Sequence, residues 1–231
     1  MFPALLLAVA FILFIGFAWG QVGQAADQRT QTQTAADAGS VAAGKQVRLE
    51  AVLSAVSSLP TPLSHLIDVG GAGGATTACD AADRNWSANR HRTTHLSCAD
   101  LSVQRIGSNG VRVDLVGPSG ELSPGPVTGN ENTPVRVHST VRVSFHRCPQ
   151  VDGGGPAALV AARIVDQAAL TLGVGPTGCG DGLGVGPGWG SVLGPLLGGD
   201  GGELPDDVAD PIRSLNPIRL AEQSFRVEIV D

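Results

Sequence analysis

Residues 2–19 read FPALLLAVAFILFIGFAW, and this apolar run decides the architecture of the chain together with the sequence behind it. Only Pro3 and Gly16 disfavour a helix, and the run carries no charged side chain. At 1.5 Å per residue the run reaches about 27 Å, close to the ~30 Å of a bilayer core. Residues 21–59 follow without a proline and are rich in Ala, Gln and Thr. The pattern predicts a transmembrane anchor (residues 1–20) that continues as a helical stalk (residues 21–59).

A cleaved secretory signal is the alternative interpretation of the apolar run. Ala18 and Gly20 flank Trp19 with the small-x-small spacing of a cleavage site. A secretory signal, however, has a basic segment ahead of a shorter apolar run, and no lysine or arginine precedes this one. The sequence therefore favours a retained, single-pass anchor.

Composition limits the remainder of the chain. The formal net charge is −6, which disfavours a nucleic-acid partner because such partners are bound by basic surfaces. The 32 glycines and 15 prolines lie mostly after residue 117, which indicates loops there. We expect one modest extracytoplasmic α+β domain over residues 60–148, a Gly/Pro-rich low-complexity excursion over residues 149–222, and a C-terminal strand over residues 223–231.

The chain has four cysteines outside the apolar run, namely Cys79, Cys98, Cys148 and Cys179. An even number in a chain that enters the secretory route favours disulfides and an oxidising compartment. Of the three pairings, Cys79–Cys98 and Cys148–Cys179 are favoured, because each joins the nearest cysteines. A metal site at His91, His95 and Cys98 is the alternative, but no CxxC or HExxH spacing supports it. We therefore expect disulfides, no metal and no cofactor.

Short helices and alternating strands make up the predicted outer domain. Thr77 and Asp80 have the spacing of a capping box, and the helix that they start is expected to end near Asn89. Period-two alternation predicts strands at four places, around residues 101–103, 111–115, 135–145 and 225–229, the first two joined by a turn at Asn109-Gly110. Residues 157–172 are apolar enough for a helix or a strand, and the rest of residues 149–222 is expected to be exposed.

These elements give an α+β fold class. A long N-terminal transmembrane and stalk helix is followed by a small antiparallel β-sheet packed on one or two helices, with a Gly/Pro-rich insertion.

A family resemblance rests on two segments. Residues 33–43 read QTAADAGSVAA, directly behind the apolar helix, and resemble the Q-x-A-A-D-A-A-A-L-A-A signature of TadE/TadG-like Flp pilus-assembly proteins. Residues 78–82 (ACDAA), Asn89, Cys98 and the following hairpin are similar in order to actinobacterial members. The resemblance covers roughly residues 2–117.

The resemblance implies a structural, non-catalytic role. It implies a pilin-like component of a tight-adherence pilus or a related secretion apparatus, anchored in the bacterial cytoplasmic membrane with its C-terminal domain outside the cytoplasm. The implied partners are other membrane-anchored pilus or secretion components, and a homo-oligomer is a further alternative.

The first segment also has a physical interpretation as a helix-packing motif. Its members are Gln33, Ala35, Ala36, Asp37, Ala38 and Gly39. Small side chains on one face of a helix permit close approach of a second helix. We therefore expect this face to contact a helix of a partner, and the alternative is a solvated stalk whose alanines reflect helix propensity.

Catalytic patterns are weak, so we expect no enzyme. Residues 173–178 match GxGxxG formally, but glycines follow where a dinucleotide site needs a helix. His138 and His146 fall on the polar side of a strand, where solvated residues are usual, and no nucleophile motif accompanies them. The alternative function is a membrane-tethered extracytoplasmic binding module for a cell-envelope ligand, with the Gly-rich region as its contact loop.

Overall fold

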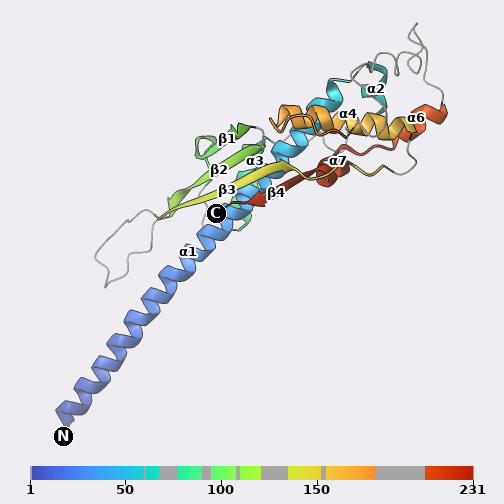
Figure 1. Cartoon of the computed structure of the whole chain (residues 1–231). Helices are drawn as coiled ribbons and strands as arrows, with labels where there is room; N and C mark the ends of the chain where they lie inside the picture. Colours follow the sequence, from blue (N-terminus) through green and yellow to red (C-terminus); the bar gives the residue numbers. More distant parts are fainter. Residues whose placement is uncertain are drawn as a thin grey trace.

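The computed structural model describes residues 2–59, 61–67, 77–89, 95–107, 110–120, 135–151, 155–179 and 206–230. Figure 1 shows the elements, which are in chain order α1 (Phe2–Ser57), α2 (Thr61–Leu66), α3 (Ala78–Ala88), the 3₁₀ turn η1 (Cys98–Asp100), β1 (Leu101–Arg105), β2 (Val111–Gly120), β3 (Val135–Phe145), α4 (Gly155–Thr171), α6 (Asp206–Arg213), α7 (Pro217–Ser224) and β4 (Phe225–Ile229).

The long helix α1 contains the predicted anchor and the predicted stalk in one continuous helix. Its N-terminal part stands clear of the other elements, whereas its C-terminal part runs through the middle of them (Figure 1). Burial begins at Thr32 and recurs along the helix to Val56. The predicted stalk over residues 21–59 is helical to Ser57, but from about Thr32 onward it is buried, because the small side chains of this region let the sheet and other helices pack around α1.

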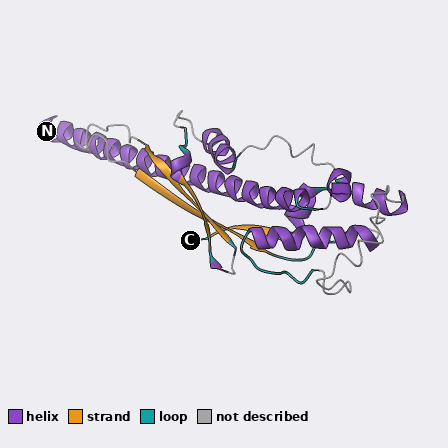
Figure 2. Cartoon of the chain, turned by 90° about the horizontal axis from the view of Figure 1, so that it is seen from above, coloured by secondary structure: helices purple, strands orange, loops and turns teal. Residues whose placement is uncertain are grey.

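The sheet has four antiparallel strands in the order β1-β2-β3-β4, as the alternation predicted. In the register, Val113 lies opposite Val141, so that valines from neighbouring strands share the face that covers α1. The strands cross α1 obliquely (Figure 2). Gly110, at the start of β2, has a φ of +105°, a backbone conformation that glycine tolerates best. Asn109 of the predicted turn lies outside the described residues.

Two glycines of α1 mark where the helix and the sheet are closest. A Cβ atom added at Gly44 would lie 2.9 Å from Val227 Cγ1 and 3.0 Å from Val141 Cγ1. One added at Gly39 would lie 3.1 Å from Leu115 Cδ1 and 3.3 Å from the Ala82 carbonyl oxygen of α3. Glycine weakens a helix by about 1 kcal/mol relative to alanine, so its presence here is explained by packing rather than by helix formation.

Helix α3 packs against α1 near Gly39. Its capping box is confirmed: the Asp80 backbone N–H donates to Thr77 Oγ1 at 3.2 Å, and the Thr77 N–H donates to Asp80 Oδ2 at 3.0 Å. The helix ends at Ala88 with Asn89 as its C-cap, as predicted. Trp86 is fully buried, and its ring lies so close to Gly117 of β2 that any Cβ there would overlap it. Trp86 thus fixes α3 against the hairpin.

The described part of residues 149–222 contains helix α4, where a helix or a strand was expected over residues 157–172, and helices α6 and α7, where none was expected. Helix α4 is an apolar core helix, with Val160, Ile164 and Val165 almost fully buried, and it packs against α1. Helix α7 starts at Asn216, whose side chain accepts hydrogen bonds from two backbone N–H groups, with Pro217 in the first turn. Proline is favourable at that position, so here it begins a helix instead of indicating a loop. Residues 180–205 lie outside the described residues.

Candidate functional site

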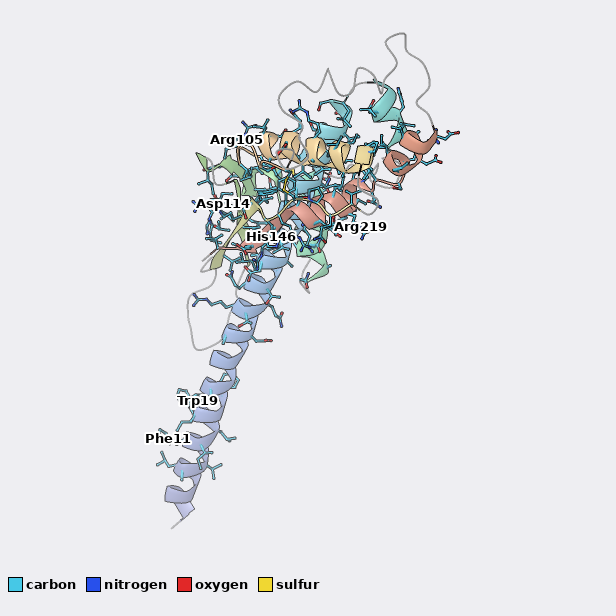
Figure 3. All side chains as sticks on the ribbon, turned by 45° about the vertical axis from the view of Figure 1, so that its right-hand side comes forward. Phe11, Trp19, Arg105, Asp114, His146 and Arg219 are labelled. Atoms are coloured by element: carbon cyan, nitrogen blue, oxygen red, sulfur yellow. A yellow bond between two sulfur atoms is a disulfide. The ribbon has the colours of Figure 1, made fainter. Side chains whose placement is uncertain are left out.

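The N-terminal part of α1 exposes large apolar side chains. Figure 3 shows Phe11 and Trp19 projecting from this part of the helix, away from the other elements, and they are 64% and 74% exposed. Leu7, Ile12 and Leu13 are exposed to a similar degree. Contiguous apolar surface of this kind is typical of a membrane or protein contact.

A membrane-spanning length is not found among the described residues. No helix in the described part of the chain has a stretch that is both long and apolar enough to cross a bilayer. The side chains of residues 2–6 and Ala18, which belong to the apolar run, are outside the described part.

The predicted helix-packing motif is used inside the chain. Ala35 and Ala36 have no exposed surface, and Gly39 touches both α3 and β2. The motif does pack against a helix, but that helix is α3 of the same chain, together with the sheet. The expectation that Ala35, Ala36 and Gly39 face a partner's helix is therefore wrong. Among these small residues, Ala38 keeps partial exposure.

This correction changes what a bulky substitution should do. We expect Ala36→Leu to lower the free energy of unfolding of the outer domain by about 1–3 kcal/mol, because overpacking a filled core forces neighbours to move. The measurement is the urea midpoint of the full chain in detergent. Ala26→Leu is the matched control, since Ala26 is an exposed residue of the same helix and should leave the midpoint unchanged. Equal midpoints for the two variants would contradict the burial of Ala36.

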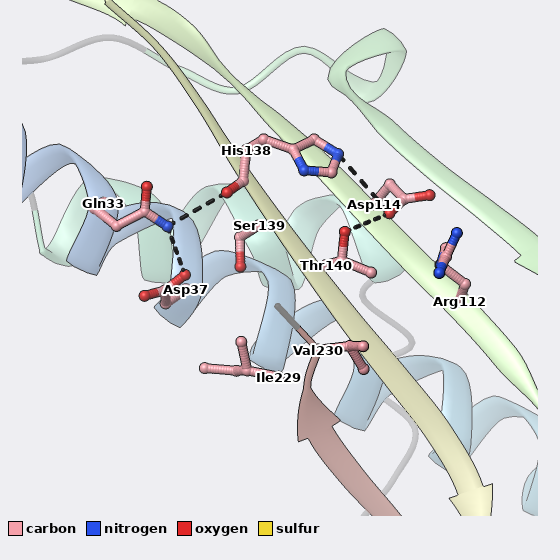
Figure 4. Close-up of a pocket in the computed structure, with 9 residues that line it drawn as sticks. All are labelled: Gln33, Asp37, Arg112, Asp114, His138, Ser139, Thr140, Ile229 and Val230. Atoms are coloured by element: carbon pink, nitrogen blue, oxygen red, sulfur yellow. Dashed lines mark hydrogen bonds and ion pairs between the residues drawn. The ribbon is translucent and has the colours of Figure 1, made fainter.

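The two polar members of the motif line an open groove of about 730 Å³ where α1 meets the sheet (Figure 4). Gln33 Nε2 donates to Asp37 Oδ1 at 3.0 Å and to the His138 carbonyl oxygen at 3.3 Å. The buried hydroxyls of Ser40 and Ser139 are 2.8 Å apart and hydrogen-bond α1 to β3. These contacts fix the orientation of β3 on the helix, because buried polar groups need partners.

The strand side of this groove is also polar. Thr140 Oγ1 donates to Asp114 Oδ1 at 2.7 Å, and His138 Nε2 lies 3.8 Å from the same oxygen. Arg112 stands on the same strand as Asp114 (Figure 4). The threonine hydroxyl donates to a carboxylate and the histidine is beyond hydrogen-bond distance, so this geometry does not activate a nucleophile. The groove offers donors and acceptors to a polar ligand.

Two disulfides cross-link segments of the folded domain that surrounds α1. Cys79 is joined to Cys98, and Cys148 to Cys179, with Cα–Cα distances of 5.4 Å in both. These are the pairs that the sequence favoured. The first ties α3 to η1 just before β1, and the second ties the chain after β3 to the loop after α4. Because Cys98 is bonded to Cys79, it is not a zinc ligand, and His91 of that alternative lies outside the described residues. No group of His, Cys, Asp and Glu suited to a metal occurs among the described residues.

An acidic side chain supports the first disulfide. Asp83 Oδ1 accepts a hydrogen bond of 2.7 Å from the Leu96 backbone N–H, and its other oxygen lies 3.3 Å from His95 Nδ1. The hydrogen bond from Leu96 lowers the pKa of Asp83, and His95 adds to the effect. The carboxylate therefore anchors the segment that leads to Cys98 to α3.

The disulfide pairing predicts specific cross-linked peptides. Digestion of the unreduced chain with trypsin should yield residues 49–84 joined to residues 93–105, and residues 148–163 joined to residues 164–213. Mass spectrometry before and after reduction identifies these pairs. Recovery of residues 49–84 joined to either peptide of the second pair would contradict the fold.

Most of the groove has no local sequence pattern that predicts it. Asp114, Thr140, Ser40 and Ser139 were not singled out, because their proximity arises only when β3 packs on α1. One signal was present: Ser139 stands at an inward-facing strand position between Val137 and Val141, where an apolar residue is usual. A polar residue at such a position indicates a buried partner.

Comparison with known proteins identifies the N-terminal segment. Residues 1–46 match the family model described as "Putative Flp pilus-assembly TadE/G-like". The match confirms the family resemblance over the apolar run and the QTAADAGSVAA segment, and it implies involvement in Flp pilus assembly at the cell envelope. It ends before the cysteine helix, so similarity to actinobacterial members stays a prediction. No curated protein and no solved structure matches the chain.

Proposed function

We propose that this chain, whose N-terminal segment is TadE/G-like, is a membrane-anchored, pilin-like structural component of a tight-adherence pilus or a related secretion apparatus. The observation that carries the proposal is the construction of α1. One end of the helix exposes large apolar side chains, and the other end is the core of a disulfide-bonded domain. A protein built this way holds its outer domain at a fixed distance from the membrane.

The proposed topology places the outer domain outside the cytoplasmic membrane. The two disulfides support this orientation, because disulfides persist in oxidising compartments and are rare in the cytosol. We place the boundary between the anchor-bearing helix and the outer domain near Thr32, where burial begins. The partners are other anchored components of the same apparatus, and the role requires no catalysis.

A complementation experiment tests the function. Cells that lack this chain should lose assembled surface fibres, and the full chain should restore them. A variant in which residues 2–19 are replaced by a cleavable secretory signal should form both disulfides but should not restore fibres. Normal fibres without the chain, or full restoration by the released domain, would refute the proposal.

The polar groove favours the alternative function, a tethered module that binds a cell-envelope ligand. Its lining of Asp114, His138 and Thr140 could bind a polar group. Under that alternative, Asp114→Asn with Thr140→Val would abolish function although the chain stays anchored and folded. Under the proposed function, the same double variant should still restore fibres.

A further inference from the structure

A second groove, of about 490 Å³, lies along α1 between α3 and α7. Its floor is the strip of α1 from Ala38 to Leu49, which corresponds to about 17 Å or three helical turns. Along the strip, Ala38, Val41, Ala42 and Leu49 are only partly buried. The groove therefore has a partly apolar floor, with the side chains of Lys45, Gln46 and Arg48 between the apolar ones, on the same helix that carries the exposed apolar N-terminal end.

Each wall of this groove includes an alanine. Ala81 of α3 faces one side and Ala221 of α7 the other, while Ile218, 38% exposed, stands at the rim. Small side chains on the floor and the walls let the backbone of a third element approach closely. All three sides are helices, whose backbone groups are paired internally, so no open strand edge is available for a strand to join. An amphipathic helix is the element that fits such a groove.

The charges on the groove indicate what the helix carries. Lys45 is exposed on the floor and is the only lysine of the chain. Arg48 lies one turn further, with its side chain 12% exposed. Arg48 Nη1 donates to the Phe225 carbonyl oxygen at 3.1 Å, and Glu222 is 4.0 Å from Nη2. The Nε atom of Arg48 is buried and has no hydrogen-bond partner among the described residues. The groove is thus lined by two cations and one carboxylate, and a carboxylate carried by a bound helix would balance the remaining positive charge.

We propose that this groove binds an α-helix of another membrane-anchored chain, lying along α1 with an aspartate or glutamate against Lys45 and Arg48. The inference rests on the proposed function, since both helices then emerge from the same membrane. Three turns of helix bury less surface than a stable free complex requires. Two chains held in one membrane meet at a high effective concentration, which compensates for the small contact.

The single lysine provides a specific test. Carbodiimide joins an amine to a carboxylate that it touches, forming an amide with loss of water. In membranes that contain the full chain, treatment and trypsin digestion should give residues 30–48 linked through Lys45 to an Asp or Glu in a helical segment of a different anchored chain. Links only to Glu50 or Glu222 of this chain, or only to a second isotopically labelled copy, would overturn the proposal.

Charge exchange at the identified residue completes the test. Lys45→Glu should reduce co-isolation of the linked protein roughly tenfold, because like charges then meet. Lys45→Arg keeps the charge and should retain co-isolation. Changing the partner's acidic residue to lysine should restore binding to Lys45→Glu. Both variants should show the urea unfolding midpoint of the unaltered chain and should form both disulfides, which verifies that they fold.

The fibre assay separates the two proposals. If cells without the chain lose fibres but Lys45→Glu restores them fully and co-isolates its partner normally, the groove inference fails and the proposed function stands. If cells without the chain keep their fibres, the proposed function itself fails.

Discussion

A chain in which Phe11 and Phe14 are both replaced by arginine should leave the membrane. Both phenylalanines are exposed on the free part of α1, at 64% and 61%. In a bilayer, exchange of phenylalanine for arginine near the centre of a spanning helix costs about 3–4 kcal/mol, so two exchanges cost roughly 6–8 kcal/mol.

Alkaline extraction of membranes measures the result. The unaltered chain and the matched Phe11→Leu, Phe14→Leu variant should stay in the extracted pellet, because leucine is as apolar as phenylalanine on the insertion scale. The arginine variant should appear in the supernatant or be degraded. Retention of the arginine variant in the pellet at the level of the unaltered chain would show that this part of α1 is not the anchor.

Trp86→Ala should destabilise the outer domain by about 3–5 kcal/mol, which is a large share of the 5–15 kcal/mol that stabilises a typical domain. Trp86 is fully buried, and its ring occupies the space that Gly117 leaves free. Removing the ring leaves a cavity between α3 and β2 that rigid neighbours cannot fill.

Thermal or urea unfolding of the full chain in detergent, with disulfides intact, measures this loss. Trp19→Ala is the matched control, because Trp19 is 74% exposed at the other end of the molecule and should leave the unfolding of the outer domain unchanged. Equal stability of the two variants would mean that Trp86 does not fix α3 to the hairpin.

The elements that the sequence predicted correctly are those with local patterns. Strand β3 has an uninterrupted period of two over residues 135–145, and α3 has a capping box at Thr77 and Asp80. The apolar run and the proline-free sequence after it predict α1. Nearest-neighbour pairing gives the disulfides Cys79–Cys98 and Cys148–Cys179, because the fold brings together elements close in sequence.

The errors arose where small or helix-breaking residues have a second role. Ala35, Ala36 and Gly39 have no large apolar side chain, so their pattern resembles a solvated or intermolecular helix, although all three are buried in the core. The Gly/Pro content after residue 117 indicates loops, but Pro217 stands in the first turn of α7. Both grooves combine α1 with elements from distant parts of the chain, and no local pattern predicts such proximity.

The central claim is that α1 is one helix with a membrane-embedded end and a buried end, and amide hydrogen exchange on the chain in lipid vesicles tests it most directly. Residues 7–17 and 32–56 should exchange slowly, the first because lipid excludes water and the second because the outer domain closes around them. Amides near Gly23 and Asp27, where the helix is exposed, should exchange faster. Exchange over residues 32–56 as fast as around Asp27, or fast exchange over residues 7–17, would contradict the account.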